Sequence, residues 1–191
     1  MACSINHPSE YKGSTEYYDE EATRNWYSRL SLESAINAAC LGKENASKRH
    51  PHFHRKWQLN NMATRSQKAT KALIRCIDDI RACTDFDNLL ELVEQELMAG
   101  PDPAWENSRN SVLTYDIADW IACSLGLAPE YVYLHDGCRR GVEMALGRRL
   151  PPRQRYICLD ELPNQWRGMK PYQLETAFCA FASGKPKQWK R

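Results

Sequence analysis

The chain has 191 residues, of which 42% are hydrophobic and 26% are charged, and its formal net charge at pH 7 is +2. These values are ordinary for a soluble globular protein that is long enough to bury a real core. No stretch approaches the eighteen or more consecutive apolar residues of a membrane-spanning helix, which excludes a span of that kind.

The eight cysteines are scattered along the chain, and no CxxC pair occurs. This distribution favours reduced thiols over a disulfide framework or a four-cysteine metal cluster. The first residues, MACSINHPSEYKG, lack the basic start and apolar core of a signal peptide. We therefore expect a cytoplasmic protein with no membrane partner, no bound metal and no cofactor; the sequence leaves the oligomeric state open.

Charge is unevenly distributed. Residues 78–107 are strongly acidic, whereas residues 48–56, 148–155 and 184–191 are basic. Segregated positive charge is what a nucleic-acid-binding face needs, because contacts to phosphate supply most of the affinity. The alternative is that these basic segments are only solvated loops and tails.

The first part of the chain is expected to contain an arm followed by helices. Residues 1–30 are polar and aromatic and predict an arm, either free or packed on the domain. Ser31 as N-cap and Gly42 as a stop predict a helix between them. Residues 64–84 predict another helix, because its apolar residues recur at helical spacing. That face contains Ala72, Leu73, Cys76, Ile77 and Ile80.

The rest of the chain is also expected to be helical. A helix that starts at a cap provided by Asp85 or Asp87 extends to Gly100, and the next ends at Gly126. Pro171 lies in the first turn of the last helix. These helices are expected over residues 85–99, 112–125, 137–146 and 170–183. With no convincing strand pair, the prediction is a single all-α domain over residues 31–183, followed by a basic tail over 184–191.

One segment resembles a known family. The sequence YVYLHDGCRRGVEMALG (131–147) is an apolar run that ends at Asp136, followed by a helix that mixes basic and apolar residues. Together with the preceding helix, YDIADWIACSLG, it resembles the helix-hairpin-helix superfamily of DNA glycosylases over about residues 86–147. The resemblance implies a compact helical domain with a helix-hairpin-helix-like element. It also implies an N-glycosylase that flips a modified or unusual base out of DNA and excises it, leaving an abasic site.

The resemblance also assigns residue roles. Asp136 would be the catalytic carboxylate, which stabilises positive charge on the sugar and orients water. Asp116 and Ile117 stand where lyase-competent members place a lysine, which implies a monofunctional enzyme. The flipped base would be held by Trp105, Tyr115, Trp120, Tyr131, Tyr133 and His135. DNA phosphates would be bound by Asn110, Ser111, Arg139, Arg140, His52, His54, Arg55 and Lys56.

Several alternatives remain open. Asp136 is also a good N-cap for the helix that follows it. The aromatic residues, Trp120 and Tyr131 above all, could be core residues. His50, His52 and His54 could bind zinc, but the cationic neighbours and the lack of a nearby Cys, Asp or Glu favour a basic loop that contacts the phosphate backbone of DNA. The whole chain could be a non-catalytic helical module that binds nucleic acid or protein. Defence against viruses with modified bases would suit the glycosylase, although no particular residue indicates it.

Overall fold

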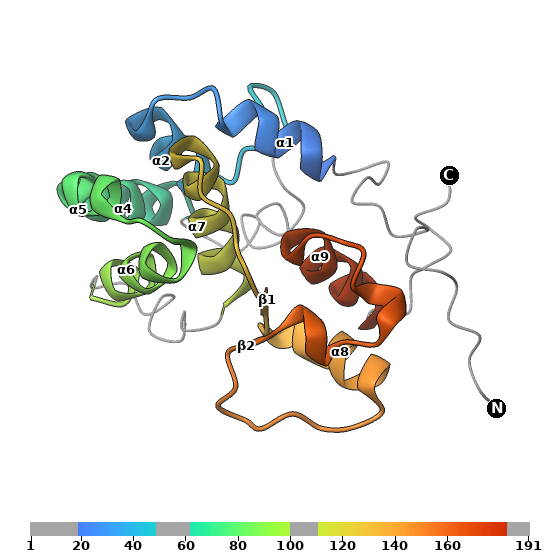
Figure 1. Ribbon diagram of the computed structural model, residues 1–191. Helices are drawn as coiled ribbons and strands as arrows, with labels where there is room; N and C mark the ends of the chain where they lie inside the picture. The colour runs from blue at the N-terminus through green and yellow to red at the C-terminus, as the bar shows by residue number, and fades with distance from the viewer. Residues whose placement is uncertain (1–18, 49–61, 100–110, 183–191) are drawn as a thin grey trace. The chain divides into compact units, whose positions relative to one another are not determined.

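The computed structural model describes residues 19–48, 62–99 and 111–182, and α-helices dominate these residues (Figure 1). Strand pairing among them is confined to β1 (Val132–Tyr133) and β2 (Tyr156–Ile157). The all-α prediction is therefore confirmed. Contacts divide the chain into two compact units, here called the N-terminal unit (Glu21–Pro129) and the C-terminal unit, whose described residues are 19–20 and 130–182. The prediction that residues 31–183 form a single domain stays a prediction.

The N-terminal unit consists of helices. They are α1 (Glu20–Tyr27), α2 (Leu32–Cys40), α4 (Met62–Arg75), α5 (Ile77–Ala82), α6 (Phe86–Met98) and α7 (Val112–Leu125). Helix α1 lies within the predicted arm, and its residue Tyr27 is completely buried. This part of the arm is thus packed on the unit.

The predicted helix ends are confirmed where the structure describes them. The side chains of Ser31 and Asp85 each accept a hydrogen bond from a backbone N–H three residues later, so each is an N-cap as predicted. Ser111, which was expected to contact phosphate, caps α7 in the same way. Asp85, rather than Asp87, is the cap of α6. Gly126 ends α7 in the left-handed conformation, at φ 72°, which glycine adopts without a steric penalty.

Helix α7 forms the centre of the N-terminal unit. It packs against α2 and α6, and almost all of its side chains are buried. The ring of Trp120 stacks on Tyr27, with centroids 5.5 Å apart. Arg24 of α1 donates a hydrogen bond to the carboxylate of Asp119, also on α7, and the two side chains form an ion pair. The side chains of α7, the last helix of this unit, thus contact α1, α2 and α6.

The helix expected over residues 64–84 is two helices. Cys76 departs from helical geometry, with φ −105° and ψ 26°, and separates α4 from α5. The predicted apolar face survives the break, because Ala72, Leu73 and Ile80 are all buried. Periodicity therefore predicted which side chains are buried, but it did not predict the interruption.

The C-terminal unit contains the two strands and α8 (Asp136–Leu146), the 3-10 turns η3 (Leu159–Glu161) and η4 (Asn164–Trp166), and α9 (Pro171–Ala182). The strands are antiparallel, with Val132 opposite Ile157 and Tyr133 opposite Tyr156. This short pair was not predicted, since two residues are too few to show an alternating pattern. The core of the unit consists of Val132, Leu134, Cys138, Val142, Leu150, Ile157, Leu162, Trp166, Leu174, Ala177, Phe178 and Ala180.

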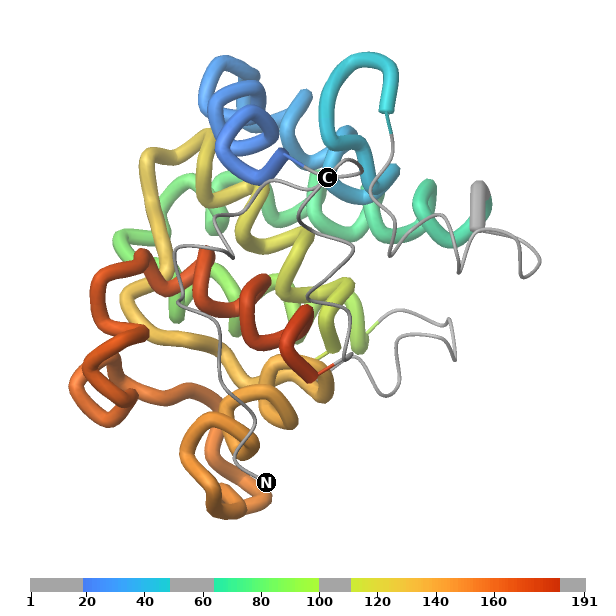
Figure 2. Tube along the Cα trace, turned by 90° about the vertical axis from the view of Figure 1, so that its right-hand side faces the viewer, coloured from blue at the N-terminus to red at the C-terminus, as the bar shows by residue number. Residues whose placement is uncertain are grey.

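Helices α8 and α9 lie against each other, as two views show (Figures 1 and 2). They approach most closely at Gly141, where an added Cβ would lie 2.0 Å from the carbonyl oxygen of Phe178. One turn earlier, a Cβ at Gly137 would lie 3.1 Å from the sulfur of Cys179. Two glycines four residues apart therefore let the backbones of α8 and α9 meet.

Candidate functional site

Asp136 is the first residue of α8, and its side chain is exposed. The N-cap is His135, with φ −74° and ψ 169°, so the interpretation of Asp136 as the cap is wrong by one residue. A carboxylate in the first turn still suits the positive end of the helix dipole. The catalytic role of Asp136 stays a prediction.

Two arginines follow Asp136 on α8 and have different surroundings. Arg139 donates hydrogen bonds to the backbone carbonyls of Pro151 and Gln154, so it fastens the loop that follows the helix. Arg140 is exposed. It lies one turn after Asp136 on the same face, and it is therefore the arginine of the two that is open to a phosphate.

The loop between α8 and β2, here called the basic loop (residues 147–155), carries further positive charge. Arg148, Arg149 and Arg153 are exposed. Arg149 forms an ion pair with Glu143 at 2.7 Å, and Glu143 also accepts a hydrogen bond from the backbone N–H of Leu150. That backbone bond, together with Arg149, lowers the pKa of Glu143 below its usual value. The basic loop is thus held against α8 by both its backbone and its side chains.

The aromatic residues expected to line a base pocket belong to two units. In the N-terminal unit, Trp120 is 1% exposed and Tyr115 packs edge-on against Phe86. In the C-terminal unit, Tyr133 is buried. Trp120 is therefore a core residue, as the alternative interpretation proposed.

Tyr131 is arranged differently. It is half-buried and stacks on Tyr156, with ring centroids 4.4 Å apart, and Tyr156 is 40% exposed. The stacked pair joins the start of β1 to the start of β2, at the end of the basic loop. An aromatic surface therefore lies beside a basic one within the C-terminal unit.

The remaining predicted DNA contacts are described only in part. Ser111 accepts the N–H of Thr114 at 3.1 Å, so its hydroxyl caps α7. The other candidates, Trp105, Asn110, His52, His54, Arg55 and Lys56, lie outside the described residues.

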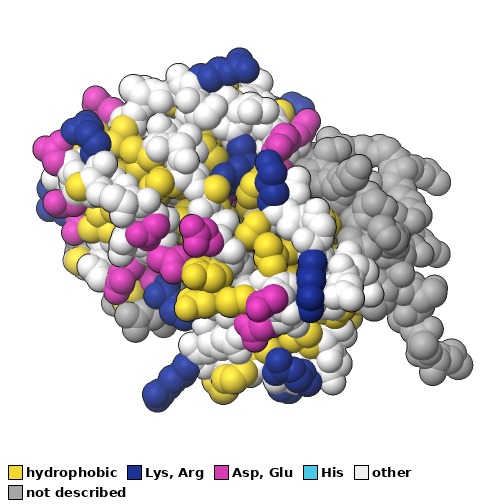
Figure 3. Space-filling view, viewed as in Figure 1, with side chains coloured by type: hydrophobic (Ala, Val, Ile, Leu, Met, Phe, Trp, Pro, Cys, Tyr) yellow, Lys and Arg dark blue, Asp and Glu magenta, His cyan; other side chains and the backbone are white. Residues whose placement is uncertain are grey.

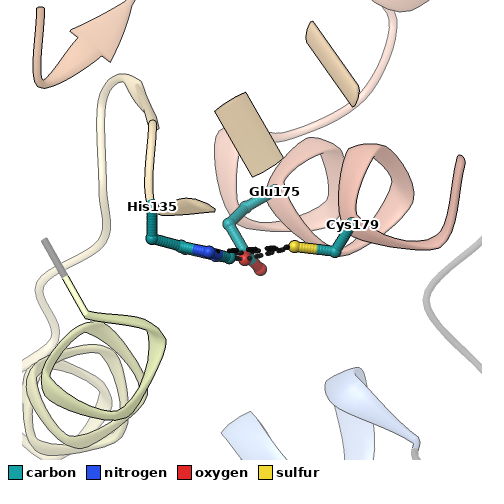
Figure 4. A group of neighbouring side chains, drawn as sticks. All are labelled: His135, Glu175 and Cys179. Atoms are coloured by element: carbon teal, nitrogen blue, oxygen red, sulfur yellow. Dashed lines mark hydrogen bonds and ion pairs between the residues drawn. The ribbon is translucent and has the colours of Figure 1, made fainter. Parts of the chain in front are cut away.

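A cluster that the sequence interpretation did not assemble lies beside Asp136. His135 is in hydrogen-bond contact with Glu175 through its Nε2 atom and the Oε1 atom of the carboxylate. The sulfur of Cys179 lies 3.5 Å from the same Nε2 atom and 3.3 Å from the same Oε1 atom. Figure 4 shows the three side chains pointing toward one another. We call these residues the His135 cluster.

The local folding of the unit explains the His135 cluster. Glu175 and Cys179 are four residues apart on α9, which places both on one face of that helix. His135 leaves β1 and starts α8, and the close contact at Gly137 brings the start of α8 onto Cys179. The sequence signal was the Glu-x-x-x-Cys spacing in the last helix, but nothing in it indicated a partner forty residues earlier.

Burial sets the electrostatics of the His135 cluster. His135 and Glu175 are 4% and 6% exposed, and Cys179 is partly open to solvent. The predicted role of His135 against a base or phosphate would require this buried pair to separate. Burial, and then the negative charge of Glu175, raises the pKa of the neighbouring Cys138 thiol well above its usual value, so Cys138 is neutral. The cluster thus combines an imidazole, a carboxylate and a thiol, a set suited to proton transfer or to metal binding.

No family model, curated protein or solved structure matches the chain. The helix-hairpin-helix resemblance therefore stays a prediction. Helices α6 and α7, which it takes as the helix pair, pack against each other, and the connection between them lies outside the described residues. In residues 19–48, 62–99 and 111–182, every helix is too short or too polar to cross a membrane.

Proposed function

We propose that this chain binds DNA and hydrolyses the N-glycosidic bond of a modified or unusual base, with Asp136 as the catalytic carboxylate. The observation that carries the proposal is an exposed carboxylate at the start of α8, on a surface that is otherwise rich in arginine. An exposed acid among cations can act at the sugar, while the cations bind the phosphates on either side.

The cations come from α8 and the basic loop. Arg140 lies one turn after Asp136, and Arg148, Arg149 and Arg153 follow on the loop. Figure 3 shows Lys and Arg side chains along the lower edge of this face, where the basic loop lies in Figure 1. We expect this surface to give most of the affinity, and therefore a strong dependence of affinity on salt.

The stacked pair of Tyr131 and Tyr156 provides the aromatic surface. Base–aromatic stacking tolerates different bases and contributes about 1–3 kcal/mol per base. Because Tyr156 is 40% exposed, one side of the pair can accept a nucleobase. We therefore expect an aromatic contact for DNA in the same unit as Asp136.

In the proposed reaction, the nucleotide first leaves the base stack. The carboxylate of Asp136 stabilises the positive charge that develops on the sugar and orients a water molecule toward C1′. The water's oxygen bonds to C1′ as the bond to the base breaks, and a proton goes to the departing base. Asp116 is buried in α7 and no lysine takes its place, so the product is an abasic site without a strand nick. We place this activity in the cytoplasm, where thiols such as Cys179 stay reduced.

A second candidate is a helical module that binds nucleic acid or protein without catalysis. It is favoured by one observation: Tyr115, Trp120 and Tyr133 are core residues, so three of the aromatics expected in a base pocket pack inside the two units. In that case the basic loop and the stacked tyrosines bind single-stranded nucleic acid, and Asp136 serves only the helix.

The experiment that separates the two candidates uses the wild-type chain and a panel of oligonucleotides that carry different modified bases. Released base is measured by chromatography, and strands are analysed before and after alkali. The glycosylase predicts base release from at least one member of the panel, with strand cleavage only after alkali. Tight, salt-sensitive binding without base release from any member would establish the second candidate instead.

A further inference from the structure

The His135 cluster has a use that the proposed glycosylase does not need. Three chemically different donors, a ring nitrogen, a carboxylate oxygen and a sulfur, all lie within 4.8 Å of one another. We propose that His135, Glu175 and Cys179 bind one zinc ion. The proposal rests on these three side chains alone, and it stands or falls independently of Asp136.

The spacing of the donor atoms fits a single small ion. Ligands about 2.0–2.3 Å from zinc at tetrahedral angles lie about 3.3–3.8 Å from one another. The Cys179 sulfur lies 3.5 Å from Nε2 of His135 and 3.3 Å from Oε1 of Glu175. The third pair, His135 and Glu175, is in hydrogen-bond contact. Those two atoms must move apart to a ligand–ligand distance as the ion replaces the proton that the pair shares.

The geometry favours a metal ion over a thiol nucleophile. In a Cys–His–carboxylate relay, the thiol faces one ring nitrogen of the histidine and the carboxylate orients the other. Here Cys179 and Glu175 both approach Nε2 of His135, and the sulfur is farther from Nδ1, at 4.0 Å. Donors that converge on one point can share one cation, whereas a proton relay needs them in series.

The type of ligand identifies the metal. A thiolate and an imidazole prefer zinc to the hard cations magnesium and calcium, which take oxygen ligands. Two ligands four residues apart on one helix face, with a third from elsewhere in the chain, is an arrangement that holds zinc rigidly. Three protein ligands leave a fourth position, and the partial exposure of Cys179 gives solvent access from its side.

Zinc binding has a defined proton balance and a structural consequence. Cys179 binds as a thiolate, so its proton passes to solvent, together with the proton shared by His135 and Glu175. The ion joins the start of α8 to the middle of α9, two elements forty residues apart. We therefore expect zinc to raise the midpoint of thermal unfolding of the full chain.

Cobalt(II) chloride is the probe for the first experiment, because cobalt(II) reports a thiolate ligand by a charge-transfer absorption band that zinc does not show. The apo protein is titrated with cobalt and then with zinc, which should displace cobalt and remove the band. Cys179→Ser should abolish the band, and Cys158→Ser, a partly buried cysteine of the same unit, should retain it. The histidines of the HPHFH segment carry no sulfur, so they cannot produce this signal.

A second measurement uses the wild-type chain and so does not depend on the folding of any variant. The apo protein is alkylated with iodoacetamide, with or without zinc chloride, and each cysteine is followed by peptide mass spectrometry. Zinc should slow alkylation of Cys179 by about tenfold or more, since a metal-bound thiolate is a poor nucleophile, and leave Cys158 unchanged. No cobalt–thiolate band in the wild type, a band that survives Cys179→Ser, or equal alkylation of Cys179 with and without zinc would each overturn the proposal.

Discussion

Gly141→Ala is expected to destabilise the C-terminal unit strongly. The new methyl group would lie 2.0 Å from the Phe178 carbonyl oxygen and 2.6 Å from the carbonyl carbon, both of them backbone atoms of α9. Relief requires α8 and α9 to move apart by about 1 Å, and a gap of that size removes about a quarter to a half of each dispersion contact across it. Overpacking of this kind costs about 1–3 kcal/mol or more, and the gain in helix propensity from alanine, about 1 kcal/mol, offsets part of it. We expect a net loss of about 2 kcal/mol, the upper end of the overpacking cost less the gain in propensity, because the opposing backbone atoms cannot rotate away.

The matched control is Gly137→Ala, one turn away on the same helix. The closest contact of its methyl group would be the Cys179 sulfur, at 3.1 Å, and that side chain can shift by a few tenths of an ångström. Urea unfolding followed by tryptophan fluorescence measures both variants, because Trp166 is buried in this unit beside Phe178. Gly137→Ala should stay within about 1 kcal/mol of the parent. If Gly141→Ala proves as stable as the parent, the close crossing of α8 and α9 is incorrect.

Three further variants test the N-terminal unit and the proposed DNA-binding surface. Burial raises the pKa of Glu44 to about 7, and its Oε1 atom is buried without a hydrogen-bond partner among the described residues. Folding therefore favours the protonated form of Glu44, and the free energy of unfolding should fall as pH rises from about 4.5 to 7. Glu44→Gln should remove this loss and be more stable than the parent by about 2 kcal/mol at pH 8, as measured by urea unfolding across pH. Arg24→Met leaves the buried carboxylate of Asp119 without this cation and should cost about 3 kcal/mol, whereas Arg24→Met with Asp119→Leu should recover most of it; equal stabilities of the single and double variants would contradict a buried pair. Arg140→Gln should weaken DNA binding and reduce the salt slope by about 1 in a fluorescence anisotropy titration, while Arg81→Gln in the N-terminal unit should change neither.

Local chemistry made much of the fold predictable. Ser31 was identified as a cap, and Asp85 as one of two candidates, because a cap is a hydrogen bond between neighbours in sequence, which needs no knowledge of the tertiary structure. Gly126 was identified as a stop for the same reason. The interruption at Cys76 was missed because it changes the helical backbone conformation without disturbing the apolar face on which the helix prediction rested.

The candidate site was less predictable, because it depends on tertiary contacts. His135 and Cys179 meet only because α8 crosses α9 at a glycine, which a one-dimensional pattern does not encode. Arg139 was expected to bind a DNA phosphate. Its guanidinium donates hydrogen bonds to backbone carbonyls of the basic loop, whose path the sequence did not indicate. The carboxylate of Asp136 was found by resemblance, and its exposure came only from the structure.

The most direct test of the proposed function compares Asp136→Asn with the wild type on whichever modified DNA is cleaved, under single-turnover conditions. Asparagine keeps the shape of the side chain and removes its charge, and the arginines proposed to bind phosphate are unchanged. The matched control is Glu130→Gln, another exposed acid of the C-terminal unit. We predict that Asp136→Asn binds DNA with unchanged affinity and releases base more slowly by about 10²-fold or more, while Glu130→Gln retains the full rate. Full base release by Asp136→Asn would contradict the account.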